Sequence, residues 1–129
     1  MFNRIAILAA ALLAIALSST AFAAERTKFD QTAFADAKKA GKSIVVHVTA
    51  PWCPTCKAQK PIVDSLLTTP EYKDTVLLDV DFDTSLPTLR ALNVRSQSTL
   101  IAYKGEAEKG RSTGATNADA IEALIKSAQ

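Results

Sequence analysis

The chain has two cysteines, and they lie two residues apart in the stretch Trp52-Cys53-Pro54-Thr55-Cys56. This stretch follows an apolar run rich in β-branched residues, and it opens a segment with a helical pattern. Two cysteines in the first turn of a helix can close a small disulfide ring, and the helix N-terminus favours the thiolate of the first one. Disulfide exchange needs such a thiolate to attack and a second thiol to resolve the mixed disulfide. The motif therefore predicts a redox-active pair, with no cofactor beyond the Cys53–Cys56 disulfide itself.

The same cysteine spacing also occurs in metal sites. A structural zinc ion takes about four protein ligands, whereas this chain offers two cysteines and one histidine. A metal-binding module remains an alternative, because thiolates favour copper(I) and iron–sulfur clusters, and two chains together would supply four of them. A chaperone or adaptor with a structural disulfide is a third possibility. The strand–motif–helix context favours redox chemistry.

The first 23 residues have the three parts of a secretory signal peptide. Arg4 supplies the positive charge, residues 5–17 form an apolar run, and Ala21-Phe22-Ala23 is a small-residue cleavage site. The apolar run is shorter than the ~20 residues that a membrane span needs. We therefore expect a signal peptide over 1–23 and a domain over 24–129 that is periplasmic or secreted and is not inserted in a membrane after cleavage.

The charge balance of the chain excludes little. Of its 15 basic and 13 acidic residues, the expected leader carries one basic residue and no acidic one, which leaves the remainder close to neutral. Such a balance favours neither nucleic acid nor an anionic membrane surface as a partner. About one hundred residues suffice for one hydrophobic core, and we expect a monomer with no nucleic-acid partner.

The order of the predicted elements indicates an α/β fold. Hydrophobic periodicity and turn residues predict the following elements. They are a helix over 31–40, a strand over 43–49, a helix over 57–67 kinked at Pro61, a strand over 75–82, a helix over 86–92, a hairpin of 100–103 and 107–112, and a helix over 117–127. This order implies a mixed β-sheet with helices on both faces.

The chain resembles the thioredoxins over essentially the whole of residues 24–129. The resemblance rests on Ala50-Pro51-Trp52-Cys53-Pro54-Thr55-Cys56-Lys57, Pro61, Val80-Asp81-Phe82-Asp83, Asn93-Val94-Arg95-Ser96, Gly105 and Gly114. It implies a thioredoxin fold and a thiol–disulfide oxidoreductase. It further implies that Cys53 is the exposed nucleophile, Cys56 the buried resolving thiol and Trp52 an aromatic platform beside them.

The Cys-Pro-Thr-Cys version is more similar to the exported, membrane-tethered reductants of cytochrome c maturation than to cytosolic thioredoxins. This resemblance implies reduction of protein disulfides, with a membrane thiol reductase as the electron donor. The same motif acts as a disulfide oxidant or isomerase if its reduced form is the more stable one. We expect substrate to contact Trp52, Pro54, Thr55, Gln97 and Ser98.

Ser98 stands where thioredoxins carry a cis-proline that faces the dithiol. A cis bond before a residue other than proline costs about 2.5–4 kcal/mol, so we expect a trans Gln97–Ser98 peptide and a rearranged loop. The Ser98 hydroxyl could then reach the Cys53 thiolate. The alternative is a neutral replacement in the loop.

His47, the only histidine in the chain, stands where thioredoxins bury an acid beneath the cysteines. One hypothesis makes His47 the proton acceptor for Cys56, since an ordinary histidine pKa of about 6.5 suits proton transfer near neutrality. A protonated His47 would also favour both thiolates. The alternative is a packed core histidine with one hydrogen bond.

Three aspartates alternate along the next strand, at positions 79, 81 and 83. Asp79 lies nearest to the position of a lysine that pairs with the buried acid in thioredoxins, so a His47–Asp79 pair is a second hypothesis. A carboxylate in this place would orient the imidazole. The alternative is that the three aspartates form the solvated face of a strand end.

Overall fold

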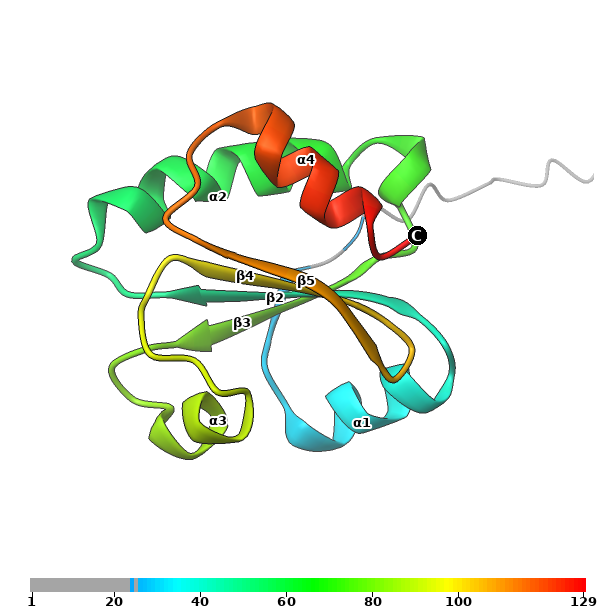
Figure 1. Cartoon of the computed structure of the whole chain (residues 1–129), viewed down its shortest axis with the longest axis horizontal. Helices are drawn as coiled ribbons and strands as arrows, with labels where there is room; N and C mark the ends of the chain where they lie inside the picture. Colours follow the sequence, from blue (N-terminus) through cyan, green and yellow to red (C-terminus); the bar gives the residue numbers. More distant parts are fainter. Residues whose placement is uncertain (1–23, 25) are drawn as a thin grey trace, which may run out of the picture.

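A computed structural model describes residues 24 and 26–129, and the expected signal peptide lies outside these residues (Figure 1). The elements are β1 (Arg26–Lys28), α1 (Gln31–Lys39), β2 (Ser43–Thr49), α2 (Pro54–Leu67), the 3-10 helix η1 (Pro70–Tyr72), β3 (Val76–Asp81), α3 (Leu86–Ala91), β4 (Thr99–Lys104), β5 (Ala107–Thr113) and α4 (Ala118–Lys126). No helix in this part of the chain is long and apolar enough to cross a membrane.

The five strands form one mixed sheet in the order β1-β3-β2-β4-β5. β2 pairs in parallel with β3 and antiparallel with β4, while β1 pairs in parallel with the far edge of β3. β2 is therefore the central strand, and its residues from Ser43 to Val48 are all buried. A strand buried on both faces explains its almost continuous apolar run.

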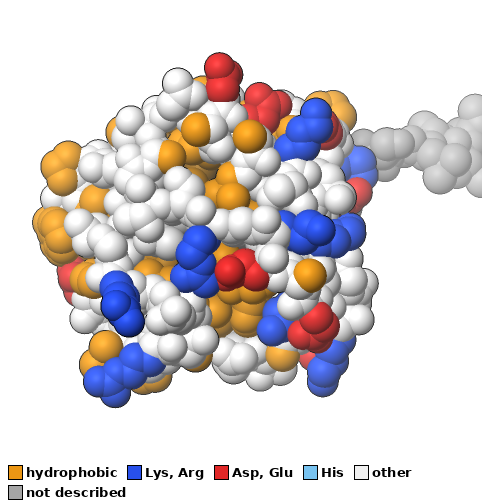
Figure 2. Space-filling model, in the orientation of Figure 1, with side chains coloured by type: hydrophobic (Ala, Val, Ile, Leu, Met, Phe, Trp, Pro, Cys, Tyr) orange, Lys and Arg blue, Asp and Glu red, His pale blue; other side chains and the backbone are white. Residues whose placement is uncertain are grey.

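Helices cover both faces of the sheet, as the sequence predicts: α2 and α4 lie on one face, α1 and α3 on the other (Figure 1). Side chains of β2 alternate between two cores. Ile44, Val46 and Val48 enter the core with α1 and α3, whereas Val45 enters the core with α2 and α4. By the same alternation His47 faces α2. Figure 2 shows basic and acidic side chains together on the viewed surface.

The predicted elements are confirmed, with shifts at their ends, but two short elements were missed. β1 has three residues with mostly exposed side chains, and η1 has three. Neither is long enough to show a hydrophobic period. α2 begins at Pro54 rather than at residue 57, and Pro61 lies within it without ending it.

Candidate active site

The Cys53–Cys56 disulfide lies at the N-terminus of α2. Cys53 is the N-cap residue of this helix, and its Sγ accepts a hydrogen bond from the backbone N–H of Cys56 at 3.1 Å. The two Cα atoms are 5.3 Å apart, and Pro54 occupies the first helical position, where its missing N–H costs nothing. The N–H that caps the helix through sulfur is also a donor for a thiolate at Cys53.

Both cysteines are buried in the disulfide form. Cys53 is 1% exposed and Cys56 3% exposed, and both pack with Ala50 and Phe82. The expectation that Cys53 is exposed is therefore wrong for this state, because Cys53 packs with Ala50 and with Phe82, which is distant in sequence. Thr55, between the cysteines, is half-buried, and Pro54 is exposed.

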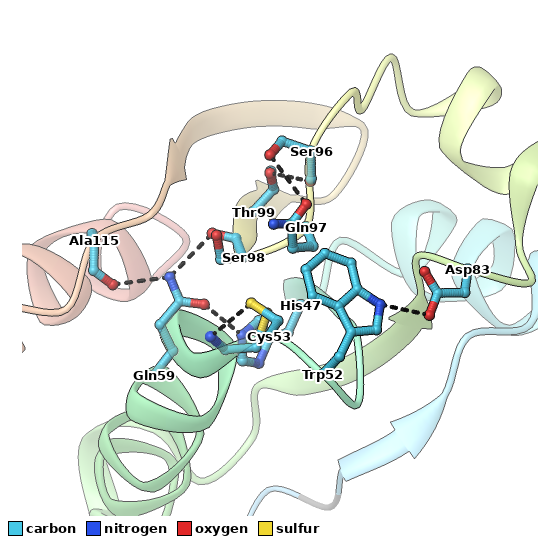
Figure 3. Close-up of a disulfide and its surroundings, with 11 residues drawn as sticks. His47, Trp52, Cys53, Gln59, Asp83, Ser96, Gln97, Ser98, Thr99 and Ala115 are labelled. Carbon is cyan, nitrogen blue, oxygen red and sulfur yellow. Dashed lines mark hydrogen bonds between the residues drawn. A yellow bond between two sulfur atoms is a disulfide. The ribbon is translucent and has the colours of Figure 1, made fainter.

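Trp52 presents a large exposed ring next to the disulfide in sequence, with 57% of its surface accessible. Its Nε1–H donates to Oδ2 of Asp83 at 2.9 Å, which fixes the direction of the indole (Figure 3). Asp81 has a different task, since its Oδ1 accepts the backbone N–H groups of Asp83 and Thr84 at the end of β3. These aspartates therefore do more than form a solvated strand end.

Ser98 lies in the loop of residues 95–98, called here the Ser98 loop, which leads into β4. Thr99 pairs with Val48 in the sheet, so the loop lies at the end of β2 that leads to the cysteines. No peptide bond among the described residues is cis, which confirms the expected trans Gln97–Ser98 bond. Ser98 has a φ of +55°, a left-handed conformation. Proline, with φ near −65°, cannot adopt it.

The Ser98 loop is tied to its surroundings mainly through backbone atoms. The carbonyl oxygen of Ser98 accepts the N–H of Gly114 at 2.9 Å, and the hydroxyl of Thr99 donates to the carbonyl of Ser96 at 2.8 Å. In the described structure Ser98 bonds through its carbonyl, not through a hydroxyl directed at Cys53. Gln97 is half-buried, and its Oε1 accepts from the Ser96 hydroxyl at 3.5 Å.

His47 and Gln59 form a hydrogen-bonded pair beneath the disulfide, and both are fully buried (Figure 3). Nε2 of Gln59 donates to the carbonyls of Ser98 (3.1 Å) and Ala115 (2.9 Å), so Oε1 faces Nε2 of His47 at 3.0 Å. An amide oxygen only accepts, so Nε2 of the imidazole carries the proton. Nδ1 is then the acceptor, and the guanidinium of Arg26 lies 3.3 Å from it.

His47 is neutral in this environment. Burial lowers its pKa to about 4; the hydrogen bond to Gln59 opposes this, and the charge of Arg26 adds to it. The stabilisation that a protonated His47 would give the two thiolates is therefore not available near neutral pH. Nε2 of His47 bonds to Gln59 and Nδ1 to Arg26. His47 therefore has no free lone pair with which to accept the proton of Cys56, as the hypothesis requires.

Arg26 separates His47 from Asp79. The two residues are register partners on β2 and β3, yet the Arg26 guanidinium bonds to both. Arg26 also donates to Oδ1 of Asp64 through Nε (2.9 Å) and through a terminal nitrogen (2.7 Å). The direct His47–Asp79 pair is therefore wrong, because the unpredicted strand β1 brings a cation to this place. Burial raises the pKa of Asp79, and Arg26 offsets part of that rise.

A pocket of about 260 Å³ opens beside the disulfide on the side of Cys56. It is lined by Arg26, Thr49, Ala50, Pro51, Cys56, Lys57, Lys60, Asp79 and Asp81. Charged side chains of both signs line this pocket together with Cys56. Cys56 lines this pocket, whereas His47 is not among the lining residues.

Sequence reasoning missed Gln59 and Arg26. Gln59 carried a signal, because it lies three residues after Cys56 and four before Val63, on the inner face of the helix. A polar residue on an apolar helix face has to find buried partners. Arg26 carried no signal, because its strand is too short to predict. Among residues 24 and 26–129, no group of three or more Cys, His, Asp or Glu side chains is placed to hold a metal ion.

A family model described as Thioredoxin matches residues 23–127. The chain belongs to the thioredoxin family. The thioredoxin H-type of Brassica campestris is 31% identical to it over 93 residues, which cover 72% of this chain and 74% of that protein. The thioredoxin of Chlamydia trachomatis serovar D is 32% identical over 99 residues, which cover 77% and 94%. The crystal structure of Trxlp from Edwardsiella tarda is 34% identical, with a TM-score of 0.76, over 78% of this chain and 98% of that one.

Membership in this family confirms the predicted fold and the predicted enzyme class. The protein is a thioredoxin-type thiol–disulfide oxidoreductase with a Cys-x-x-Cys active site, and it reduces protein disulfides. The individual roles of Cys53, Cys56 and the expected substrate contacts remain predictions.

We predict that restoring the family's proline harms this protein. Ser98→Pro is expected to lower the free energy of unfolding by more than about 1 kcal/mol, because proline is incompatible with the left-handed φ. Ser98→Gly, the control, is expected to stay within about 1 kcal/mol of the wild type or above it. Urea unfolding measures both, and a proline variant as stable as the wild type would contradict the prediction.

We predict that His47 makes stability depend on pH between about 6.5 and about 4. In this range the unfolded chain binds a proton at His47 that the folded protein does not, so stability falls as pH falls, by about 3 kcal/mol in all. His47→Leu is the comparison: it removes the histidine's part of the pH dependence and keeps the part that comes from the aspartates and glutamates. If the curves of unfolding free energy against pH are parallel for the wild type and His47→Leu, the prediction is wrong.

Proposed function

We propose that the protein is an extracytoplasmic reductase of protein disulfides, released from its leader near Ala23. The observation that carries the reductase function is the Cys53–Cys56 disulfide at the N-terminus of α2, where a backbone N–H already points at Cys53 Sγ. Export is supported by the sequence alone, through the charged, apolar and small-residue parts of residues 1–23.

The proposed reaction has two exchange steps. The thiolate of Cys53 attacks one sulfur of the substrate disulfide, which forms a mixed disulfide and expels the other substrate sulfur as a thiolate. Cys56 then loses its proton, and its thiolate attacks Cys53 Sγ. The Cys53–Cys56 disulfide forms, the reduced substrate leaves, and two electrons have passed from the dithiol to the substrate. The N–H of Cys56 stabilises the attacking thiolate of Cys53, and the sulfur that leaves in the second step is the substrate's.

Continued turnover requires that the Cys53–Cys56 disulfide be reduced again. An oxidising compartment has no large pool of reduced thiols, so we assign this step to a membrane thiol reductase. Both sulfurs are almost fully buried, so the donor has to displace part of their surroundings before it reaches the disulfide.

One prediction from this proposal concerns the direction of electron flow. Equilibration of the protein with dithiothreitol or glutathione buffers is expected to give a reduction potential near or below about −270 mV, typical of a reductant. A value of about −120 to −180 mV would instead indicate an oxidant or isomerase. Insulin reduction is expected to be lost in Cys53→Ser, whereas Cys56→Ser is expected to accumulate the mixed disulfide. Full activity in both variants would contradict the mechanism.

Another prediction from this proposal concerns the compartment in which the protein is found. When the full chain is produced in a bacterium with an outer membrane, the periplasmic fraction is expected to contain protein that begins at Ala24. Replacing Ala21 and Ala23 by bulky residues is expected to block processing, since signal peptidase needs small residues there. N-terminal sequencing of each fraction tests this. Unprocessed wild-type protein confined to the cytoplasm would overturn the proposed location and leave the reductase mechanism untouched.

A further inference from the structure

Gln59 connects three segments that are far apart in the sequence. It lies in α2, is fully buried, and bonds to His47 of β2, Ser98 before β4 and Ala115 before α4. An uncharged side chain in such a place has no water to bond with, so each of its polar atoms depends on these partners. Gln59 makes no hydrogen bond to either sulfur in the described structure.

The amide of Gln59 can take only one orientation. Its NH₂ group faces two carbonyls, so a flip would set oxygen against oxygen at Ser98 and Ala115 and leave buried donors unpaired. His47 enforces this orientation, because its Nε2–H needs an acceptor and finds Oε1. Arg26 in turn enforces the tautomer, because a guanidinium can only donate to Nδ1. The hydrogen bonds therefore run in one direction, from Arg26 through His47 and Gln59 to Ser98.

The end of this chain is the Ser98 loop. The Ser98 carbonyl accepts from Gln59 and from Gly114, and the residue is held in the left-handed region that a serine rarely adopts. In the view of Figure 3, Ser98 and Gln97 lie above the disulfide, Gln59 lies to its left and bonds directly to Ser98, and Trp52 lies to its right. If substrate makes the expected contacts with Trp52, Gln97 and Ser98, an extended segment that reaches Cys53 lies between Trp52 and this loop.

We propose that Gln59 is a positioning residue for protein substrates: it holds the Ser98 loop in the place that an extended disulfide-bearing segment requires, and His47 holds Gln59. The proposal rests on the reductase activity of the site. It assigns the pair no part in sulfur chemistry. A small disulfide reaches Cys53 without lying along the loop, so its reduction does not depend on Gln59.

The test compares two substrates in two variants of the whole protein. Gln59→Met keeps the volume and the burial but removes all three hydrogen bonds. Val63→Ala is the control, because Val63 lies one turn further along α2, is equally buried, and packs in the core. The substrates are insulin and the small aromatic disulfide 5,5′-dithiobis(2-nitrobenzoate), each reduced by the pre-reduced protein.

Gln59→Met is expected to lower kcat/KM for insulin about tenfold, mainly through KM, because the Ser98 loop loses its hydrogen bond to Gln59. The rate with the small disulfide is expected to stay within about twofold, because the sulfurs are untouched. Val63→Ala is expected to lower stability without changing the ratio of the two rates. An equal fall with both substrates, or an unchanged rate with insulin, overturns the proposal.

His47→Leu tests whether the two residues act as a unit. It is expected to lower the insulin rate as Gln59→Met does, and the double variant is expected to be no worse than either single one. Additive losses would overturn the link. A further measurement needs no variant: ¹⁵N spectra of the wild-type imidazole are expected to show a proton on Nε2 and an unprotonated Nδ1 at pH 7. The opposite tautomer would overturn the proposal even if the variants fail to fold.

Discussion

A histidine in the central strand must have every polar atom paired within the protein, because no water reaches it. This constraint shapes the whole region under the disulfide. One ring nitrogen is paired with Gln59 of α2, and the other with Arg26 of the edge strand β1. The charge of Arg26 is then balanced by Asp64 and Asp79. Buried polar groups that are all paired specify one arrangement of the elements that carry them.

Arg26 and its partners Asp64 and Asp79 matter more for the protonation state of His47 than for the free energy of unfolding. Ion pairs that remain partly exposed stabilise a fold only slightly, and buried ones can cost more than they return. Burial lowers the pKa of His47 and the charge of Arg26 lowers it further, so the imidazole stays neutral and a second proton on the ring would face the guanidinium. The neutral imidazole is a fixed donor toward Gln59. The position where thioredoxins bury an acid therefore holds an uncharged side chain in this protein.

The sulfur chemistry and the buried hydrogen-bond chain are built on different parts of α2. Cys53 and Cys56 use the unpaired N–H groups that every helix has at its first turn. Gln59 lies one turn further on, where the helix faces β2, and reaches the loops before β4 and α4. A helix can therefore carry an exchange reaction at its end and position the surrounding loops from its inner face.

The sequence by itself determined the features that depend on neighbours along the chain: the cysteine pair at a helix start, the doubly buried strand β2 and the order of strands and helices. A trans peptide before Ser98 also followed from local energetics. Only the tertiary structure decided that Cys53 is covered, that Arg26 stands between His47 and Asp79, and that Gln59 reaches Ser98. These contacts join residues 21 to 53 positions apart. Periodicity reports which face of an element is buried, but the partner on that face is chosen by how the whole chain packs.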